Sequence, residues 1–92
     1  MARVYQTYLQ GDADIRVALV DDPGMADLWV YQVSSWGMAS GDALWYVTSE
    51  RDQASVRIYF CSIGMAQIKI HFVASQGMAG WQHAHPLRGR FC

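Results

Sequence analysis

The sequence predicts a mainly β protein: one compact domain of six short repeats, each a strand followed by a single helical or 3-10 turn. Three observations support this prediction. A short motif recurs at near-constant spacing, apolar residues recur in fixed columns around it, and the segments between motifs are rich in β-branched and aromatic residues.

The triplet Gly-Met-Ala marks the repeats. It occurs four times, and two degenerate copies complete the series. The six copies end at Ala13, Ala26, Ala39, Ala54, Ala66 and Ala79. The steps between these alanines are 13, 13, 15, 12 and 13 residues, and the insertion Ser40-Gly41 explains the long step. Deleting this insertion is expected to cost little unless the third repeat packs differently from the others.

The chain is therefore expected to be a single repeat domain over 1–92. Its repeats span about 3–15, 16–28, 29–43, 44–56, 57–68 and 69–81, and a tail follows at 82–92. The strand of each repeat is short and is bounded by serine and glycine, as in the segment 58–61. There Ile58 and Phe60 alternate with Tyr59 and Cys61, so both faces carry apolar groups. This pattern predicts internal strands that are covered on both sides.

The connection between strands, such as residues 34–39, begins with N-cap-type residues and has room for one helical or 3-10 turn. We expect Ser35 or Ser75 to cap this turn. The glycine of the triplet is expected to supply a positive φ or a close backbone approach. The methionine and alanine columns are expected to fill the core, with methionine as an adaptable filler.

The length of the connections limits how the repeats are arranged. A crossover between parallel strands usually takes a dozen or more residues, and only about seven to nine are available here. The repeats are then antiparallel neighbours, coils of a narrow solenoid, or units whose sequence neighbours are not neighbours in space. A solenoid carries polar terminal caps. No such cap is recognisable, which favours a closed or self-interleaved arrangement.

The repeat unit as a whole supports a family resemblance. The matching segments are Ala13-Asp14, Ala26-Asp27, Val30-Tyr31-Gln32-Val33, Leu44-Trp45-Tyr46, Ile58-Tyr59-Phe60 and Ala79-Gly80-Trp81. With them the chain resembles the septoil-knot family of short bacterial repeat proteins over about residues 3–81. The resemblance implies a small, mainly β fold threaded into a seven-crossing torus knot, and no established biochemical activity. Ser55 and Gln67 depart from the family's pattern, since they replace its usual Asp.

Composition excludes several classes of protein. Hydrophobic residues make up 52% of the chain and charged residues 16%, which excludes a disordered protein. The net charge of −1 argues against a nucleic-acid binder, although Arg88 and Arg90 lie near two histidines in the tail. No apolar stretch is long enough to cross a membrane. We therefore expect a cytoplasmic protein with free thiols at Cys61 and Cys92, a bridge between the two being the alternative.

The tail holds the strongest candidate for metal chemistry. In an extended segment His83 and His85 face the same way, and Cys61, His71 or Cys92 would complete four ligands. The spacing matches no standard zinc signature, so two exposed histidines without a metal are expected. No cofactor is predicted.

Two further repeat columns bear on function. The serines at this turn recur five times, at 34, 35, 49, 62 and 75, so they are interpreted as capping residues and not as nucleophiles. Asp14, Asp27 and Asp42 recur in the same way and are interpreted as turn formers, with a weak calcium ladder as the alternative.

These observations predict no enzyme but a small structural or interaction module, a monomer or small homo-oligomer with no identifiable catalytic residue. Trp36 interrupts a variable turn position and is the candidate contact for an unknown protein partner. The alternative function is a small metal-binding protein or enzyme that uses the His83-x-His85 tail.

Overall fold

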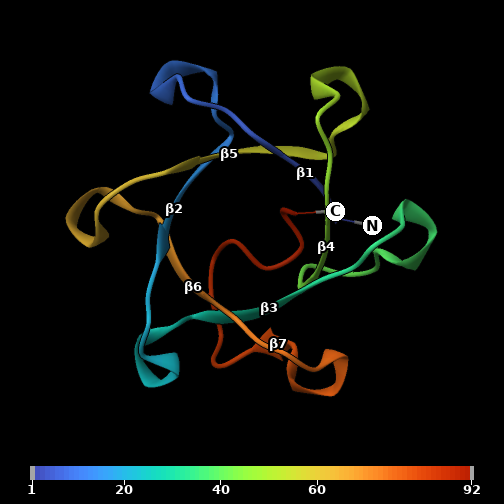
Figure 1. Ribbon diagram of the computed structural model, residues 1–92. Coiled ribbons are helices and arrows are strands. Elements are labelled where there is room, and N and C mark those ends of the chain that lie inside the picture. The colour runs from blue at the N-terminus through green and yellow to red at the C-terminus, as the bar shows by residue number, and fades with distance from the viewer. Residues whose placement is uncertain (1, 92) are drawn as a thin grey trace.

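The computed structural model describes residues 2–91 and shows a closed barrel of six short parallel strands (Figure 1). The strands are β1 (Ala2–Gln6), β2 (Ile15–Leu19), β3 (Leu28–Gln32), β4 (Leu44–Val47), β5 (Val56–Phe60) and β6 (Ile68–Phe72). A seventh strand, β7 (Gly80–Trp81), pairs antiparallel with β3. The predicted mainly β domain is confirmed.

Strands that follow one another in the sequence are mostly not neighbours in the barrel. The order around it is β4-β1-β5-β2-β6-β3, and a pairing between β3 and β4 closes the ring. The first three strands make one circuit, and the next three make a second circuit that fills the gaps left by the first. This is the self-interleaved arrangement favoured by the sequence, and it excludes both the solenoid and the antiparallel alternative.

The stagger of the strands explains why such short connections suffice. Gln6 at the end of β1 and Ile15 at the start of β2 pair with the same residue, Ile58 of β5, from its two sides. The connection therefore crosses one strand, a distance of about 10 Å. Residues 7–14, fully extended, reach about 26 Å. The dozen-residue rule for parallel crossovers does not apply, because the strands are displaced by nearly their own length.

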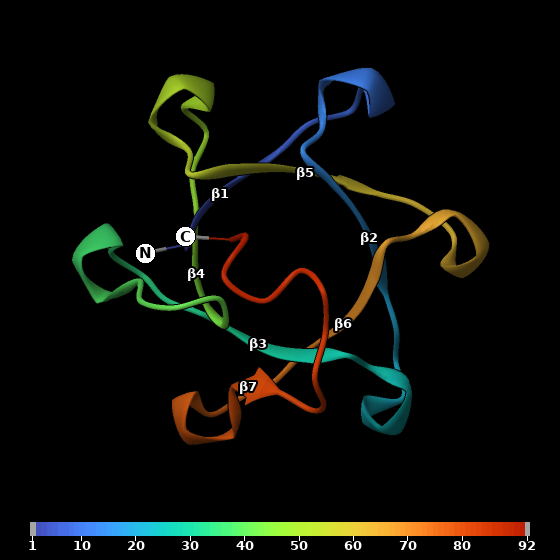
Figure 2. The same ribbon diagram turned by 180° about the vertical axis from the view of Figure 1, so that it is seen from behind.

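Each connection contains one 3-10 turn that projects outward as a knob (Figures 1 and 2). The turns are η1 (Gln10–Asp12), η2 (Pro23–Met25), η3 (Trp36–Met38), η4 (Arg51–Gln53), η5 (Ile63–Met65) and η6 (Gln76–Met78). None of their residues is buried.

The prediction that methionine fills the core is wrong. The four triplet methionines are 46–51% exposed, because the turns arch away from the barrel wall. The alanine that ends each triplet lies closer to the barrel, and Ala26 and Ala39 are buried. The expectation for the triplet glycines is also wrong. The positive-φ residues of the described chain are Gly41, Gly80 and Gly89, and a Cβ added to any of the four triplet glycines would meet no backbone atom from another part of the chain within 4 Å.

The expectation that Ser35 or Ser75 caps its 3-10 turn is wrong as well. Ser35 and Ser75 stand at the N-cap positions of η3 and η6, but their side chains make no capping hydrogen bond. The carboxylate of Asp22 does cap, and it accepts from the Gly24 N–H at 2.9 Å. As at η3 and η6, the side chain of Ser62 at the start of η5 makes no capping hydrogen bond, and the N-cap of η4 is Glu50 and not Ser49.

Asp14 and Asp27 tie strands together, which corrects their interpretation as turn formers, whereas Asp42 does lie in a turn. The Asp14 carboxylate accepts from the Arg57 N–H at 2.9 Å, and the Asp14 N–H donates to the Arg57 carbonyl at 2.8 Å. The same two-way link joins Asp27 to Lys69, Ser55 to Arg3 and Gln67 to Arg16. Each link satisfies a backbone N–H near the start of a strand, so Ser55 and Gln67 keep the role of the aspartate they replace.

Within residues 2–91 the barrel has one apolar interior and no layer of helices around it. Its buried cluster includes Val4, Val17, Val30, Ile58, Ile70 and Trp45. Outward-facing residues such as Tyr59 are only half-buried, and so is Cys61 just after β5. The prediction of strands covered on both faces is therefore wrong for the outer face.

The Ser40-Gly41 insertion marks the change from the first circuit to the second. The connection from β3 to β4 crosses no strand, since Tyr31 pairs directly with Leu44. A connection of the regular kind would place β4 where β1 already lies. The insertion forms a tight turn instead, with a bridge between Ser40 and Leu44 and a φ of 60° at Gly41.

Candidate functional site

The amino-terminal end of the barrel is closed by the C-terminal tail, which runs inside the ring of strands (Figures 1 and 2). Phe91 is fully buried and stacks on Trp45, with ring centroids 5.4 Å apart and an interplanar angle of 30°. The carbonyl of Phe91 accepts a hydrogen bond from the Ser55 hydroxyl at 2.8 Å. Phe91 is thus part of the core, Leu87 packs against that core, and the tail is held at its far end.

Asp42 anchors this tail. One of its carboxylate oxygens accepts from Trp81 Nε1 at 2.9 Å and from the Gly89 N–H at 2.6 Å. The other accepts from the Phe91 N–H at 3.2 Å. Asp42 occupies the repeat column that elsewhere links two strands. Asp42 follows the insertion between the two circuits of strands, and there its carboxylate binds the tail instead.

The two histidines of the tail converge on one carboxylate. His83 Nε2 lies 2.7 Å from Asp27 Oδ1, and His85 Nε2 lies 3.7 Å from Asp27 Oδ2. The pKa of His83 is raised by its hydrogen bond to the Ala84 carbonyl and by the one to Asp27. His85 stacks on Trp81, with ring centroids 5.4 Å apart, and is half-buried, so the expectation of two exposed histidines is wrong for His85 and holds for His83. Together they fasten the tail to the start of β3.

The other proposed metal ligands do not join them. His71 faces outward from β6 and contacts the Val20 carbonyl through Nδ1 at 2.9 Å. Cys61 is half-buried with its thiol free. Among residues 2–91 no group of three histidine, cysteine or acidic side chains is arranged to hold a metal ion. Cys92, and with it the predicted alternative of a Cys61–Cys92 bridge, lies outside the described residues.

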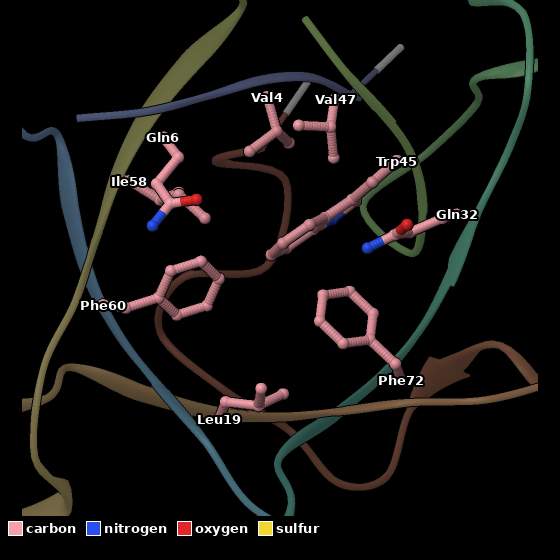
Figure 3. Close-up of a pocket in the computed structure, with 9 residues that line it drawn as sticks. All are labelled: Val4, Gln6, Leu19, Gln32, Trp45, Val47, Ile58, Phe60 and Phe72. Atoms are coloured by element: carbon pink, nitrogen blue, oxygen red, sulfur yellow. The ribbon is translucent and has the colours of Figure 1, made fainter. Parts of the chain in front are cut away.

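The opposite, carboxyl-terminal end of the barrel is open. It holds a cavity of about 240 Å³, which Figure 3 shows with its lining side chains. The last inward-facing residue of each strand forms the mouth: Gln6, Leu19, Gln32, Val47, Phe60 and Phe72. Val4, Ile58 and Trp45 form the deeper wall. The repeat therefore places six equivalent positions around one opening.

The mouth has a polar half and an apolar half. In the barrel order β4 lies between β1 and β3, so Gln6 and Gln32 flank Val47. Across the opening, Phe60 and Phe72 flank Leu19 on β2. Figure 3 shows both glutamine amides turned toward the cavity and both phenyl rings facing them.

The two amides are candidate binding groups that the sequence analysis did not identify. Neither side-chain amide is hydrogen-bonded to the rest of the described chain. No lining residue carries an ionisable side chain. A signal was present in the sequence, because the column Leu19, Val47, Phe60 and Phe72 is apolar except at these two glutamines. Without the closed ring, nothing showed that the column surrounds an opening.

A comparison with known families identifies the fold. The model of the 7(1) septoil knot domain matches residues 1–82. The chain belongs to the septoil-knot family. The two interleaved circuits and the continuation onto β3 agree with the seven-crossing knot, so the expected threaded topology is confirmed. No curated protein and no solved structure matches the chain.

The family match covers the open end of the barrel but not most of the tail. Most of the segment that closes the amino end of this septoil-knot domain, including His83, His85 and Phe91, lies beyond the matched residues. The open mouth, in contrast, is built from positions inside the match.

Within residues 2–91 no helix is long and apolar enough to span a membrane.

Trp36, the predicted contact residue, lies at the first position of η3 and is 48% exposed. The guanidinium of Arg3 lies over its ring, 5.5 Å from the centroid. Its exposure agrees with the sequence argument, and its role in binding a partner stays a prediction. It lies on an outer knob and does not line the cavity.

Proposed function

We propose that this septoil-knot domain is a non-catalytic binding module whose open barrel end holds one small, largely apolar molecule. The observation that carries the proposal is the cavity of about 240 Å³ at the carboxyl ends of all six parallel strands. An apolar cavity of about 150 Å³ lined by Leu, Ile and Phe is enough to bind benzene. The cavity here is larger and is lined by Phe60, Phe72, Leu19 and Ile58.

The construction of the site supports binding over catalysis. Each lining residue stands on a strand of a closed barrel, which holds it more rigidly than a loop does. General acid–base chemistry needs an ionisable group within reach of the ligand, and the lining supplies none.

The test uses toluene as the probe and two-dimensional NMR as the readout. Toluene is expected to shift the resonances of residues at the mouth in a saturable way. Leu19→Trp places a large side chain in the cavity and is expected to abolish these shifts. Ile63→Trp is the matched control, because Ile63 is similarly exposed but lies on η5 away from the mouth. The proposal fails if toluene shifts no mouth resonance, or if both variants respond as the unmodified protein does.

A further inference from the structure

We infer that the ligand of this cavity is a planar aromatic ring that carries a neutral carboxamide or an equivalent donor–acceptor edge. The inference rests on the proposed function and adds the chemical class of the ligand. It follows from the two unlike halves of the mouth, Gln6 and Gln32 on one side and Phe60 and Phe72 on the other.

The apolar half selects a flat ring. Phe60 and Phe72 face the opening from two sides, and Trp45 forms the wall beneath them (Figure 3). Phe72 already meets Trp45 edge to face, with centroids 6.1 Å apart at 86°. Aromatic rings gain from such offset or edge-on contacts beyond the area they bury. On the far side of Trp45 the chain's own Phe91 stacks in this way, so Trp45 accepts an aromatic partner inside the barrel.

The polar half selects a group that both donates and accepts. A glutamine amide offers two N–H donors and one carbonyl acceptor. Gln6 and Gln32 bring two such amides to the cavity, and neither is engaged with another described residue. A purely apolar ligand would cover these groups without replacing their hydrogen bonds to water, which is unfavourable. A carboxamide matches the donors and acceptors of both.

The absence of charge in the lining selects a neutral ligand. None of the nine lining residues is ionisable, so a carboxylate or an amine would lose its water without gaining a counter-charge. The size agrees as well. Taking about 150 Å³ for a bound benzene leaves on the order of 90 Å³ of the 240 Å³ cavity for one small substituent.

The experiment compares three probes of similar size: benzamide, toluene and sodium benzoate. Their dissociation constants are measured by NMR titration for the unmodified protein and for the double variant Gln6→Met, Gln32→Met. Methionine keeps the length of the side chain and removes the amide. Since the amides make no hydrogen bond to the described chain, equal unfolding midpoints are expected and serve as the control for folding.

The expected result is that benzamide binds the unmodified protein about three- to tenfold more tightly than toluene, the difference that one or two net hydrogen bonds make. In the double variant toluene binds at least as tightly as benzamide. The side-chain NH₂ resonances of Gln6 and Gln32 shift with benzamide.

Each other outcome overturns the inference in an identifiable way. If toluene binds and benzamide gains nothing from the glutamines, the ligand class is wrong and the binding function stands. If benzoate binds most tightly, the neutral ligand is wrong. If none of the three probes binds at the mouth, the proposed function fails together with the inference.

Discussion

The two ends of the barrel are built from the same repeat and end up in opposite states. At the amino end, Phe91 of the tail fills the interior and Asp42 holds the tail in place. At the carboxyl end the interior stays open, and Gln6 and Gln32 face it without partners in the described chain. Trp45 lies between the two, stacked on Phe91 below and lining the cavity above.

This contrast shows how a symmetric scaffold acquires one site. Six identical repeats would give six equivalent positions around each end of the barrel, while the two ends differ because all six strands run parallel. The insertion at Ser40-Gly41 breaks the symmetry around the ring. The aspartate that follows it, Asp42, links no two strands, and its carboxylate binds Trp81 and the tail instead. A closed end gives the barrel a packed floor, and the floor gives the open end a rigid wall against which a ligand can lie.

The largest effect is expected from deleting Ser40 and Gly41. The deletion restores an even repeat, which directs β4 toward the place of β1, so we expect loss of the folded barrel. Circular dichroism and the dispersion of the NMR spectrum measure this. Ser40→Ala, which keeps the length, is the control. A well-folded deletion variant would show that the insertion is not needed for the chain to pass from the first circuit of strands to the second.

The second effect is expected from Phe91→Ala. The side chain is fully buried and stacked, so its removal should lower the free energy of unfolding by about 3–5 kcal/mol. Phe60→Ala at the open end removes a half-buried ring and should cost clearly less. Equilibrium denaturation of both variants makes the comparison. Equal losses would contradict the view that one end is packed and the other open.

A smaller effect is expected from Asp42→Asn. The amide replaces one acceptor oxygen with a donor that faces the N–H groups of the tail, which should cost about 1–3 kcal/mol. Hydrogen exchange at Gly89 and Phe91 should speed up more than exchange in β5. Asp52→Asn, on the exposed turn η4, is the matched control and should change neither property.

The smallest effect is a dependence of stability on pH at the tail. The pKa of His83 is raised above its ordinary value of 6.5, so its contact with Asp27 contributes fully below that value. The contribution is lost as the pH rises through the raised pKa. His83→Gln should therefore flatten the fall in the free energy of unfolding just above pH 6.5. Parallel curves for the two proteins across that range would show that the contact is not coupled to protonation.

Much of this fold was predictable from the sequence, because repetition makes weak local signals additive. The recurring apolar positions predicted the strands, and the lack of polar terminal repeats favoured a closed arrangement. The exposure of Met25 and its equivalents was not predictable, since an apolar column does not reveal whether a turn points inward or outward. Phe91 was missed because a single aromatic residue at the end of a chain carries no periodic signal.

The site was hidden for a related reason. Gln6 and Gln32 are 26 positions apart, two repeats along the chain, yet they flank one strand in the barrel. Only the interleaving of two circuits places β4 between them. The sequence shows that two polar residues interrupt an apolar column. Only the closed ring of strands shows that Gln6 and Gln32 face the same opening.

The most direct test is a crystal structure of the protein soaked with benzamide. We expect one molecule in the cavity, its ring between Phe60 and Phe72 and its amide against Gln6 and Gln32, while Phe91 stays stacked on Trp45. A mouth that holds only water, or a benzamide that displaces Phe91 at the amino end, would contradict the account.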